Sequence, residues 1–170
     1  MILIGDIEAN GLLDEWEDQV ADRIHVISFK SVGDITIHGS ITGSQDEIKQ
    51  HWIDLLNAWD DLTVVFHNGI AYDLPLIEKL FGIPFTVEPD TINGKKIQII
   101  DTLVWSRNFY PDLPGGHGLL EWSKRVGTHK PFIEQWDGLP IEDYVERCVA
   151  DVETTEKVFL KLAEKMGVEI

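Results

Sequence analysis

The sequence predicts an α/β fold in which a mixed sheet of five strands is covered by helices. Three short apolar runs come first and are joined by polar loops, which is typical of neighbouring antiparallel strands. Further strand-like runs then alternate with amphipathic segments, which is typical of strands joined by helices. Since the chain has 170 residues, of which 44% are hydrophobic and 26% are charged, we expect residues 1–170 to form a single domain with its own core.

The first half of the chain is read from composition, turn residues and a capping signal. Expected strands lie at 1–7, 24–29, 35–38, 63–67 and 96–100, and expected helices at 44–59, from about 73 to 82, 101–109, 117–126 and 141–166. The first run is almost entirely apolar, and Asn10 begins a loop and an acidic stretch that reaches Asp22. The second and third runs flank Gly33 and predict a hairpin. Ser44 followed by Glu47 is a capping box that marks the start of the first helix.

The second half carries clear helix boundaries. The fourth strand is rich in β-branched residues, and the helix after it has Pro75 in its first turn and Gly82 near its end. The fifth strand leads through Asp101, a residue type that often caps helices, into a short helix. A helix with apolar residues at helical spacing follows, and then 127–140 has no regular pattern. The last helix is the clearest, because its apolar residues form one continuous stripe.

Charge and composition exclude several classes of protein. The net charge of −16, from 30 acidic and 14 basic residues, argues against broad neutralisation of duplex DNA phosphates, although weaker contact with nucleic acid stays open. No apolar stretch approaches a membrane span and the start lacks a signal-peptide pattern, so we expect a cytoplasmic protein with no membrane partner. Cys148 is the one cysteine, and a buried packing role is expected for it.

Two carboxylates, Asp6 and Glu8, follow the first apolar run. Side chains alternate along a strand, so both project from one face while Ile7 projects from the other. Close carboxylates repel each other, and a divalent cation such as Mg²⁺ or Mn²⁺ is the usual means of holding them together. Two solvated acids at a strand end would give the same pattern, so this pair alone does not decide between the two interpretations.

Asp73 and Asp151 are further carboxylates that this architecture can bring to the same place. Asp73 stands near the start of a helix, and Asp151 lies beside the apolar stripe of the last helix. Ligands of such sheets gather beyond the strand ends, which is where the first strand delivers its two acids. Four acids on separate elements can hold two metal ions, one activating water and the other stabilising the leaving oxygen of a phosphodiester.

Four segments, in this order, resemble the motifs of the DEDD superfamily of 3′→5′ exonucleases. They are Asp6-Ile7-Glu8 with Gly11-Leu12, then Phe66-His67-Asn68-Gly69-Ile70-Ala71-Tyr72-Asp73, then Asp101-Thr102-Leu103-Val104, and then Asp151-Val152-Glu153-Thr154-Thr155. The resemblance covers essentially the whole chain and is closest to the proofreading domains of phage family A DNA polymerases. It implies an RNase H-like fold with a central mixed five-stranded sheet and helices on both faces, and two divalent cations, Mg²⁺ or Mn²⁺, as cofactors.

The resemblance also implies roles for the residues that match its motifs. The metal ligands and catalytic residues would be Asp6, Glu8, Asp73 and Asp151, with Asp6 bridging both ions. The substrate-binding residues would be Ile7, Asn10, Leu12, Asn68 and Tyr72. Among these, Leu12 would stack on the terminal base, and backbone groups from Ile7 to Asn10 would hold the terminal 3′-OH.

The chain departs from the family beside the last aspartate. Members carry a tyrosine four residues before it, or a histidine five before it, to orient or deprotonate the attacking water, but here Arg147 and Glu146 stand at those positions. Arginine stays protonated and cannot act as a base, although it can hold a phosphate. Glu146 would serve only if its carboxylate reaches the site. His117 and His129 are the other candidate bases, and a structural role is expected for His117.

Residues and resemblance together predict a two-metal 3′→5′ exonuclease that removes nucleoside monophosphates from the 3′ ends of single-stranded or frayed DNA. If it proofreads in trans, its partner is a separate DNA polymerase, and a phage-encoded chain would work in the host-cell cytoplasm. An RNA or oligonucleotide exonuclease of the same superfamily is one alternative, and a catalytically weakened DNA- or polymerase-binding module is another. The basic residues that could meet a strand's phosphates are Lys95, Lys96, Arg107, Lys124, Arg125 and Lys130.

Overall fold

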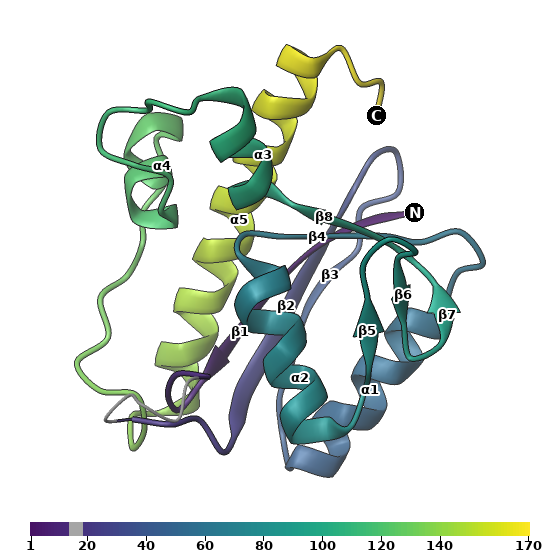
Figure 1. Cartoon of the computed structure of the whole chain (residues 1–170). Helices are drawn as coiled ribbons and strands as arrows, with labels where there is room; N and C mark the ends of the chain where they lie inside the picture. Colours follow the sequence, from purple (N-terminus) through teal and green to yellow (C-terminus); the bar gives the residue numbers. More distant parts are fainter. Residues whose placement is uncertain (14–18) are drawn as a thin grey trace.

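A mixed five-stranded sheet forms the centre of the protein (Figure 1). The computed structural model describes residues 1–13 and 19–170, so the expected acidic stretch before Asp22 lies partly outside the described residues. The strands are β1 (Ile2–Ala9), β2 (Ile24–Val32), β3 (His38–Ile41), β4 (Thr63–Phe66) and β8 (Gln98–Asp101), in the order β3-β2-β1-β4-β8. The first three pair antiparallel, whereas β4 runs parallel to both β1 and β8.

Helices cover both faces of this sheet. They are α1 (Gln45–Asn57), the π-helix η1 (Gly69–Asp73), α2 (Leu74–Phe81), α3 (Thr102–Phe109), α4 (Leu119–Val126) and α5 (Ile141–Met166). On one face Leu3 packs in a core with Trp52 of α1 and Ile77 of α2. On the other face Ile4 packs against Val152 of α5. Because alternate residues of β1 enter different cores, the strand is apolar on both faces up to Asp6.

Two strands of the central sheet begin later than the sequence predicts. The strand expected at 35–38 is β3, three residues later, because the Ser31 hydroxyl donates to the Ile35 carbonyl at 2.5 Å and accepts from the Ile37 amide at 2.8 Å, which holds these residues in the turn. The strand expected at 96–100 begins at Gln98. Lys95–Lys96 forms β7 of a separate small sheet with β5 (Phe85–Thr86) and β6 (Thr91–Ile92).

The capping signals predicted from the sequence are confirmed. Ser44 and Glu47 form both hydrogen bonds of a capping box at the start of α1, and Asp101 accepts from the Leu103 amide at the start of α3. Helix α5 spans 141–166 as its stripe predicts, with Cys148 buried. Among the described helices, none has both the length and the apolar character that crossing a membrane requires.

Candidate active site

Three carboxylates from β1 and α5 meet at one end of the sheet. Asp6 and Glu8 alternate with Ile7 and therefore project toward the face that α5 covers, and α5 brings Asp151 to them. A carboxylate oxygen of each of the three lies within 4.8 Å of the other two. This is the spacing at which one cation can contact all three.

Asp73 joins this group from η1, through a contact with the backbone of β1. Its Oδ2 atom accepts a hydrogen bond of 3.3 Å from the Ile7 amide, the residue between Asp6 and Glu8. The side chain is buried. A fourth carboxylate is thus fixed to the same stretch of backbone.

Burial and mutual repulsion destabilise the ionised forms of these acids. The pKa of Asp6 is raised well above its usual value, first by burial and then by the charges of the neighbouring carboxylates. Burial likewise raises the pKa of Glu8 to about 7, although the Arg147 guanidinium acts in the opposite direction. The pKa of Asp73 is also raised well above normal, mainly by burial. A cation placed among these groups would therefore stabilise the site, because it favours the ionised carboxylates.

Two side chains of the protein already supply positive charge there. Lys130 Nζ lies 2.6 Å from Asp151 Oδ2, and Arg147 Nε lies 3.0 Å from Glu8 Oε1. The other oxygen of Asp151, Oδ1, is buried and has no hydrogen-bond partner among the described residues. A buried carboxylate oxygen without a partner is a free ligand position, and hard oxygen donors suit Mg²⁺ or Mn²⁺.

The π-helix η1 sets the position of Asp73 at its last residue. Asn68 precedes it in the left-handed region at φ 67°, and a Cβ on Gly69 would lie 2.3 Å from the Phe66 Cβ, so only glycine fits there. The Asp101 carboxylate accepts from the amides of Asn68 at 2.9 Å and Ile70 at 3.1 Å, as well as capping α3. Asp101 thus fixes the start of η1.

A cleft of about 460 Å³ opens over the carboxylates. Four of the five residues predicted to bind substrate line it: Ile7, Leu12, Asn68 and Tyr72. The Tyr72 hydroxyl donates to the Gly11 carbonyl at 2.7 Å, which ties the loop carrying Leu12 to η1. The arrangement can hold cations at its floor and an elongated ligand above them.

Solved structures share this fold. A family B DNA polymerase from the hyperthermophilic archaeon Pyrobaculum calidifontis matches 97% of this chain with a TM-score of 0.67 and 15% identity. Exonuclease X in complex with 5′ overhanging duplex DNA matches 99% of this chain with a TM-score of 0.58 and 16% identity. The fold is an RNase H-like exonuclease fold. At these identities the likeness shows the fold alone, and the fold class predicted from the sequence is confirmed.

The two matches differ in how much of each protein is shared. This chain spans 95% of the Exonuclease X chain but only 24% of the polymerase chain. No protein-family model and no curated protein matches the sequence. Membership of the DEDD superfamily and closeness to phage family A polymerases stay predictions.

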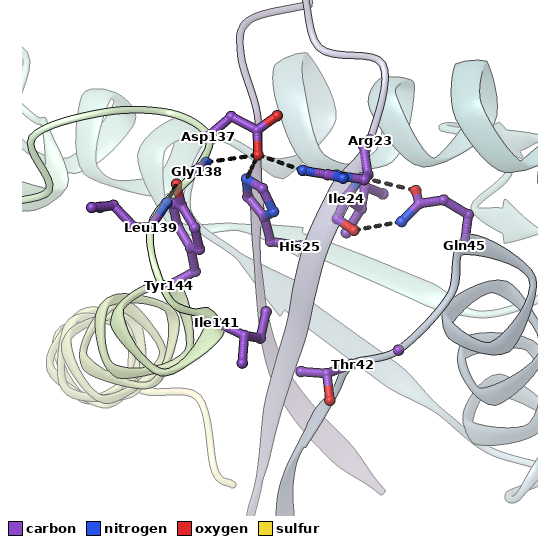
Figure 2. Close-up of a pocket in the computed structure, with 11 residues that line it drawn as sticks. Arg23, Ile24, His25, Thr42, Gln45, Asp137, Gly138, Leu139, Ile141 and Tyr144 are labelled. Atoms are coloured by element: carbon purple, nitrogen blue, oxygen red, sulfur yellow. Dashed lines mark hydrogen bonds and ion pairs between the residues drawn. The ribbon is translucent and has the colours of Figure 1, made fainter.

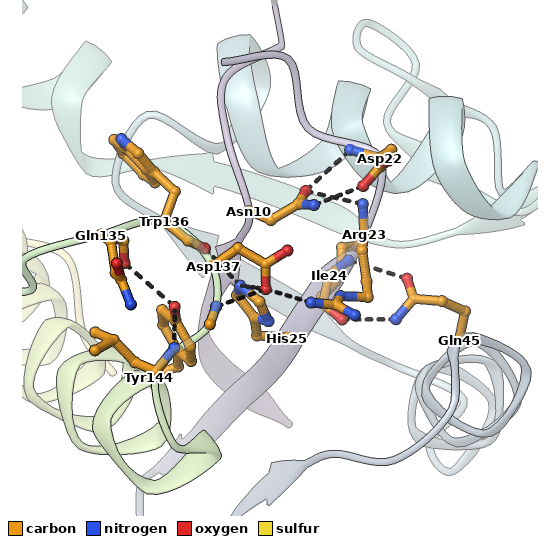
Figure 3. A network of polar contacts seen from close by, with 12 residues as sticks. Asn10, Asp22, Arg23, Ile24, His25, Gln45, Gln135, Trp136, Asp137 and Tyr144 are labelled. Carbon is orange, nitrogen blue, oxygen red and sulfur yellow. Dashed lines mark hydrogen bonds and ion pairs between the residues drawn. The ribbon is translucent and has the colours of Figure 1, made fainter.

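Asn10 is the predicted substrate-binding residue that the structure places elsewhere. It does not line the cleft. Its side-chain Nδ2 donates to Asp22 Oδ1 at 2.5 Å. Its side-chain Oδ1 accepts from the backbone amides of Asp22 and Arg23 at 3.0 Å each (Figure 3). These three hydrogen bonds hold the residues just before β2 against the end of β1.

The candidate bases differ in whether they reach the cleft. Glu146 and His129 are exposed and do not line the cleft. His117 does line it, but its Nδ1 is hydrogen-bonded to Ser106 Oγ at 2.6 Å and its carbonyl accepts from His67 Nε2 at 2.8 Å. The structural role expected for His117 therefore accounts for its contacts. Burial lowers the pKa of His67 to about 4, so that histidine is neutral at physiological pH.

Only two of the six basic residues that could meet a strand's phosphates line the cleft. Arg107 and Lys130 line it, whereas Lys95 donates to the Leu56 carbonyl at 2.9 Å near the far end of the sheet. Lys95 and Lys96 lie away from the cleft, because they precede the first residue of β8, whereas Asp6 and Glu8 lie near the last residue of the parallel strand β1. Trp136 also lines the cleft and was missed, since the segment around it has no periodic pattern.

Proposed function

We propose that this chain is a metal-dependent 3′→5′ DNA exonuclease. It would hydrolyse phosphodiester bonds at the 3′ ends of single-stranded or frayed DNA and release nucleoside monophosphates, with residues 1–170 acting as one exonuclease domain. The observation that carries the proposal is the convergence of Asp6, Glu8 and Asp151 within 4.8 Å, at the floor of a cleft. Exonuclease X, which has this fold, was solved with a 5′ overhanging duplex DNA, and this supports DNA as the ligand.

Asp6, Glu8, Asp73 and Asp151 would hold two divalent cations, Mg²⁺ or Mn²⁺. When bound, such ions lower the pKa of water and stabilise the charge on the leaving oxygen. The free Oδ1 of Asp151 and the raised pKa values of Asp6 and Asp73 fit this role. These observations support metal binding, and the identity of the ion is part of the proposal.

The remaining residues of the cleft would bind and orient the strand. Arg147 cannot accept a proton, so it would hold Glu8 in place and offer positive charge to a phosphate. Leu12 would lie against the terminal base, and Asn68 and Tyr72 would border the strand. Loss of a dedicated base costs on the order of 10² to 10⁴ in rate, which leaves room for hydrolysis supported by the metal site.

Replacing Asp6 tests the proposal directly. Wild type should shorten a 5′-labelled single strand one nucleotide at a time with Mg²⁺ or Mn²⁺. Asp6→Asn should reduce the rate by more than about 10²-fold, because even changes outside a metal's ligands commonly cost 10- to 100-fold. Asp54→Asn, an exposed carboxylate on α1, is the matched control and should leave the rate unchanged. No shortening by wild type with either ion would overturn the proposal.

The Arg147–Glu8 pair favours a second candidate, a weakened module that binds DNA or a polymerase without cutting. Binding of a single strand with no hydrolysis under either ion would support this candidate. An RNA exonuclease of the same fold is the third, and matched DNA and RNA strands of one sequence would separate it by their rates. For proofreading in trans, a polymerase supplied as a separate chain should gain fidelity in the presence of this protein.

A further inference from the structure

Trp136 stands at the cleft from a segment with no regular secondary structure. Residues 127–140 join α4 to α5, and within them Trp136 lines the same cleft as Leu12 and the carboxylates. The tryptophan is 39% exposed, which is a large apolar surface to leave in water. Figure 3 shows its ring pointing away from the polar network that surrounds its backbone.

That network holds the backbone on both sides of Trp136. His25 Nε2 donates to the Trp136 carbonyl at 2.7 Å, and the Tyr144 hydroxyl donates to the Gln135 carbonyl at 3.2 Å. The next residue, Asp137, pairs with the Arg23 guanidinium. Three consecutive residues of the segment are thus tied to β2, to Arg23 directly before it and to α5, so the backbone that carries the indole is held in place.

The cavity behind the segment completes this support. It measures about 560 Å³ and lies between β2, α1 and the start of α5 (Figure 2). Several of its polar side chains are partnered within its walls: Gln45 bonds both the amide and the carbonyl of Ile24, and the rings of His25 and Tyr144 stack at 3.9 Å. These groups act as a scaffold for the Trp136 segment.

We infer that Trp136 stacks on a nucleobase of the single DNA strand in the cleft and is a specificity-determining residue for base-bearing ends. Every base has an aromatic face, so an anchored indole can accept any sequence. The inference rests on the proposed function, because it takes the strand in the cleft to be the exonuclease substrate.

Abasic substitution combined with Trp136→Ala tests the contact. Single strands would carry one abasic nucleotide at the first, second or third position from the 3′ end. On intact strands Trp136→Ala should lower kcat/KM by roughly 5- to 100-fold, mainly through KM, as expected for loss of one stacked base. At the position that Trp136 contacts, the abasic strand should be cut equally by both proteins. Trp136→Phe should restore most of the loss.

Phe132→Ala is the matched control, since Phe132 is on the same segment, is 85% exposed and does not line the cleft. It should leave kcat/KM unchanged. Strand shortening with no effect of Trp136→Ala, or an equal effect of Phe132→Ala, would overturn the inference while leaving the proposed function intact.

A binding measurement separates failure of the inference from failure of the proposed function. Fluorescence anisotropy of labelled intact and abasic strands would be recorded with Asp6→Asn protein, with and without Trp136→Ala. Base-dependent binding that is lost with Trp136→Ala supports the inference even if wild type cuts nothing. Equal binding of intact and abasic strands at all three positions overturns it.

Discussion

Lys130 and Arg147 set fixed positive charges against the buried acids of the cleft. Each pairs with one carboxylate, Asp151 and Glu8 respectively, and partly repays the cost of burying it. The four acids were predicted from their motifs, but these pairs were not. Lys130 reaches Asp151 from 21 residues away through an irregular segment, and no local pattern encodes that approach.

Replacing Lys130 should separate its role as a counter-charge from other roles. Lys130→Met leaves Asp151 buried without its partner, so the metal-free protein should lose roughly 3 kcal/mol of unfolding free energy. Its affinity for Mn²⁺ should rise, because the ammonium no longer competes for Asp151. Denaturant unfolding in EDTA and titration calorimetry with Mn²⁺ measure the two effects.

Lys124→Met provides the comparison, since Lys124 is exposed and pairs with Glu121 on the surface of α4. It should change neither quantity measurably. Weaker Mn²⁺ binding by Lys130→Met would contradict the competition between the ammonium and the ion.

At the scale of elements, periodicity and capping located the long helices well. The capping box predicted α1 and the apolar stripe predicted α5, because each signal is local and repeated. The π-helix η1 and the small sheet of β5, β6 and β7 were not predicted. A five-residue π-helix and two-residue strands are too short to show a period, and tertiary contacts such as those of Asp101 decide them.

Asp101 should therefore stabilise two elements at once. Asp101→Ala removes the cap of α3 and leaves the amides of Asn68 and Ile70 without their acceptor, so we expect a loss of about 2 to 4 kcal/mol of unfolding free energy. Ser44→Ala removes only a cap and should lose about 1 kcal/mol. Urea unfolding curves compare them, and equal losses would show that Asp101 acts as a cap alone.

The stability of the whole molecule should depend on pH through the buried acids. Burial raises the pKa of Glu8 from its ordinary 4.5 to about 7. Its contribution to the free energy of unfolding is therefore fully present below about pH 4.5 and is lost as the pH rises through 7. The shift corresponds to roughly 3 kcal/mol. Asp6 and Asp73 act in the same direction. Denaturant unfolding in EDTA from pH 4.5 to 8 would measure the change.

Glu8→Gln isolates this contribution because glutamine does not titrate. The difference in unfolding free energy between wild type and Glu8→Gln should shift against wild type by roughly 3 kcal/mol across this range. Saturating Mn²⁺ should remove the shift, because the ion favours the ionised carboxylate. A difference that stays constant with pH would contradict the raised pKa.

The acids and their counter-charges enter the chain far apart in time during synthesis. Asp6 and Glu8 are made before Lys130, Arg147 and Asp151, which follow together in one later segment, and Asp151 and Arg147 are placed by α5. A growing chain thus holds the first two acids without the groups that complete the cluster until that later segment has been made. Under the proposed function, hydrolysis would begin only after α5 has packed, so unfinished chains would not degrade nucleic acid near the ribosome.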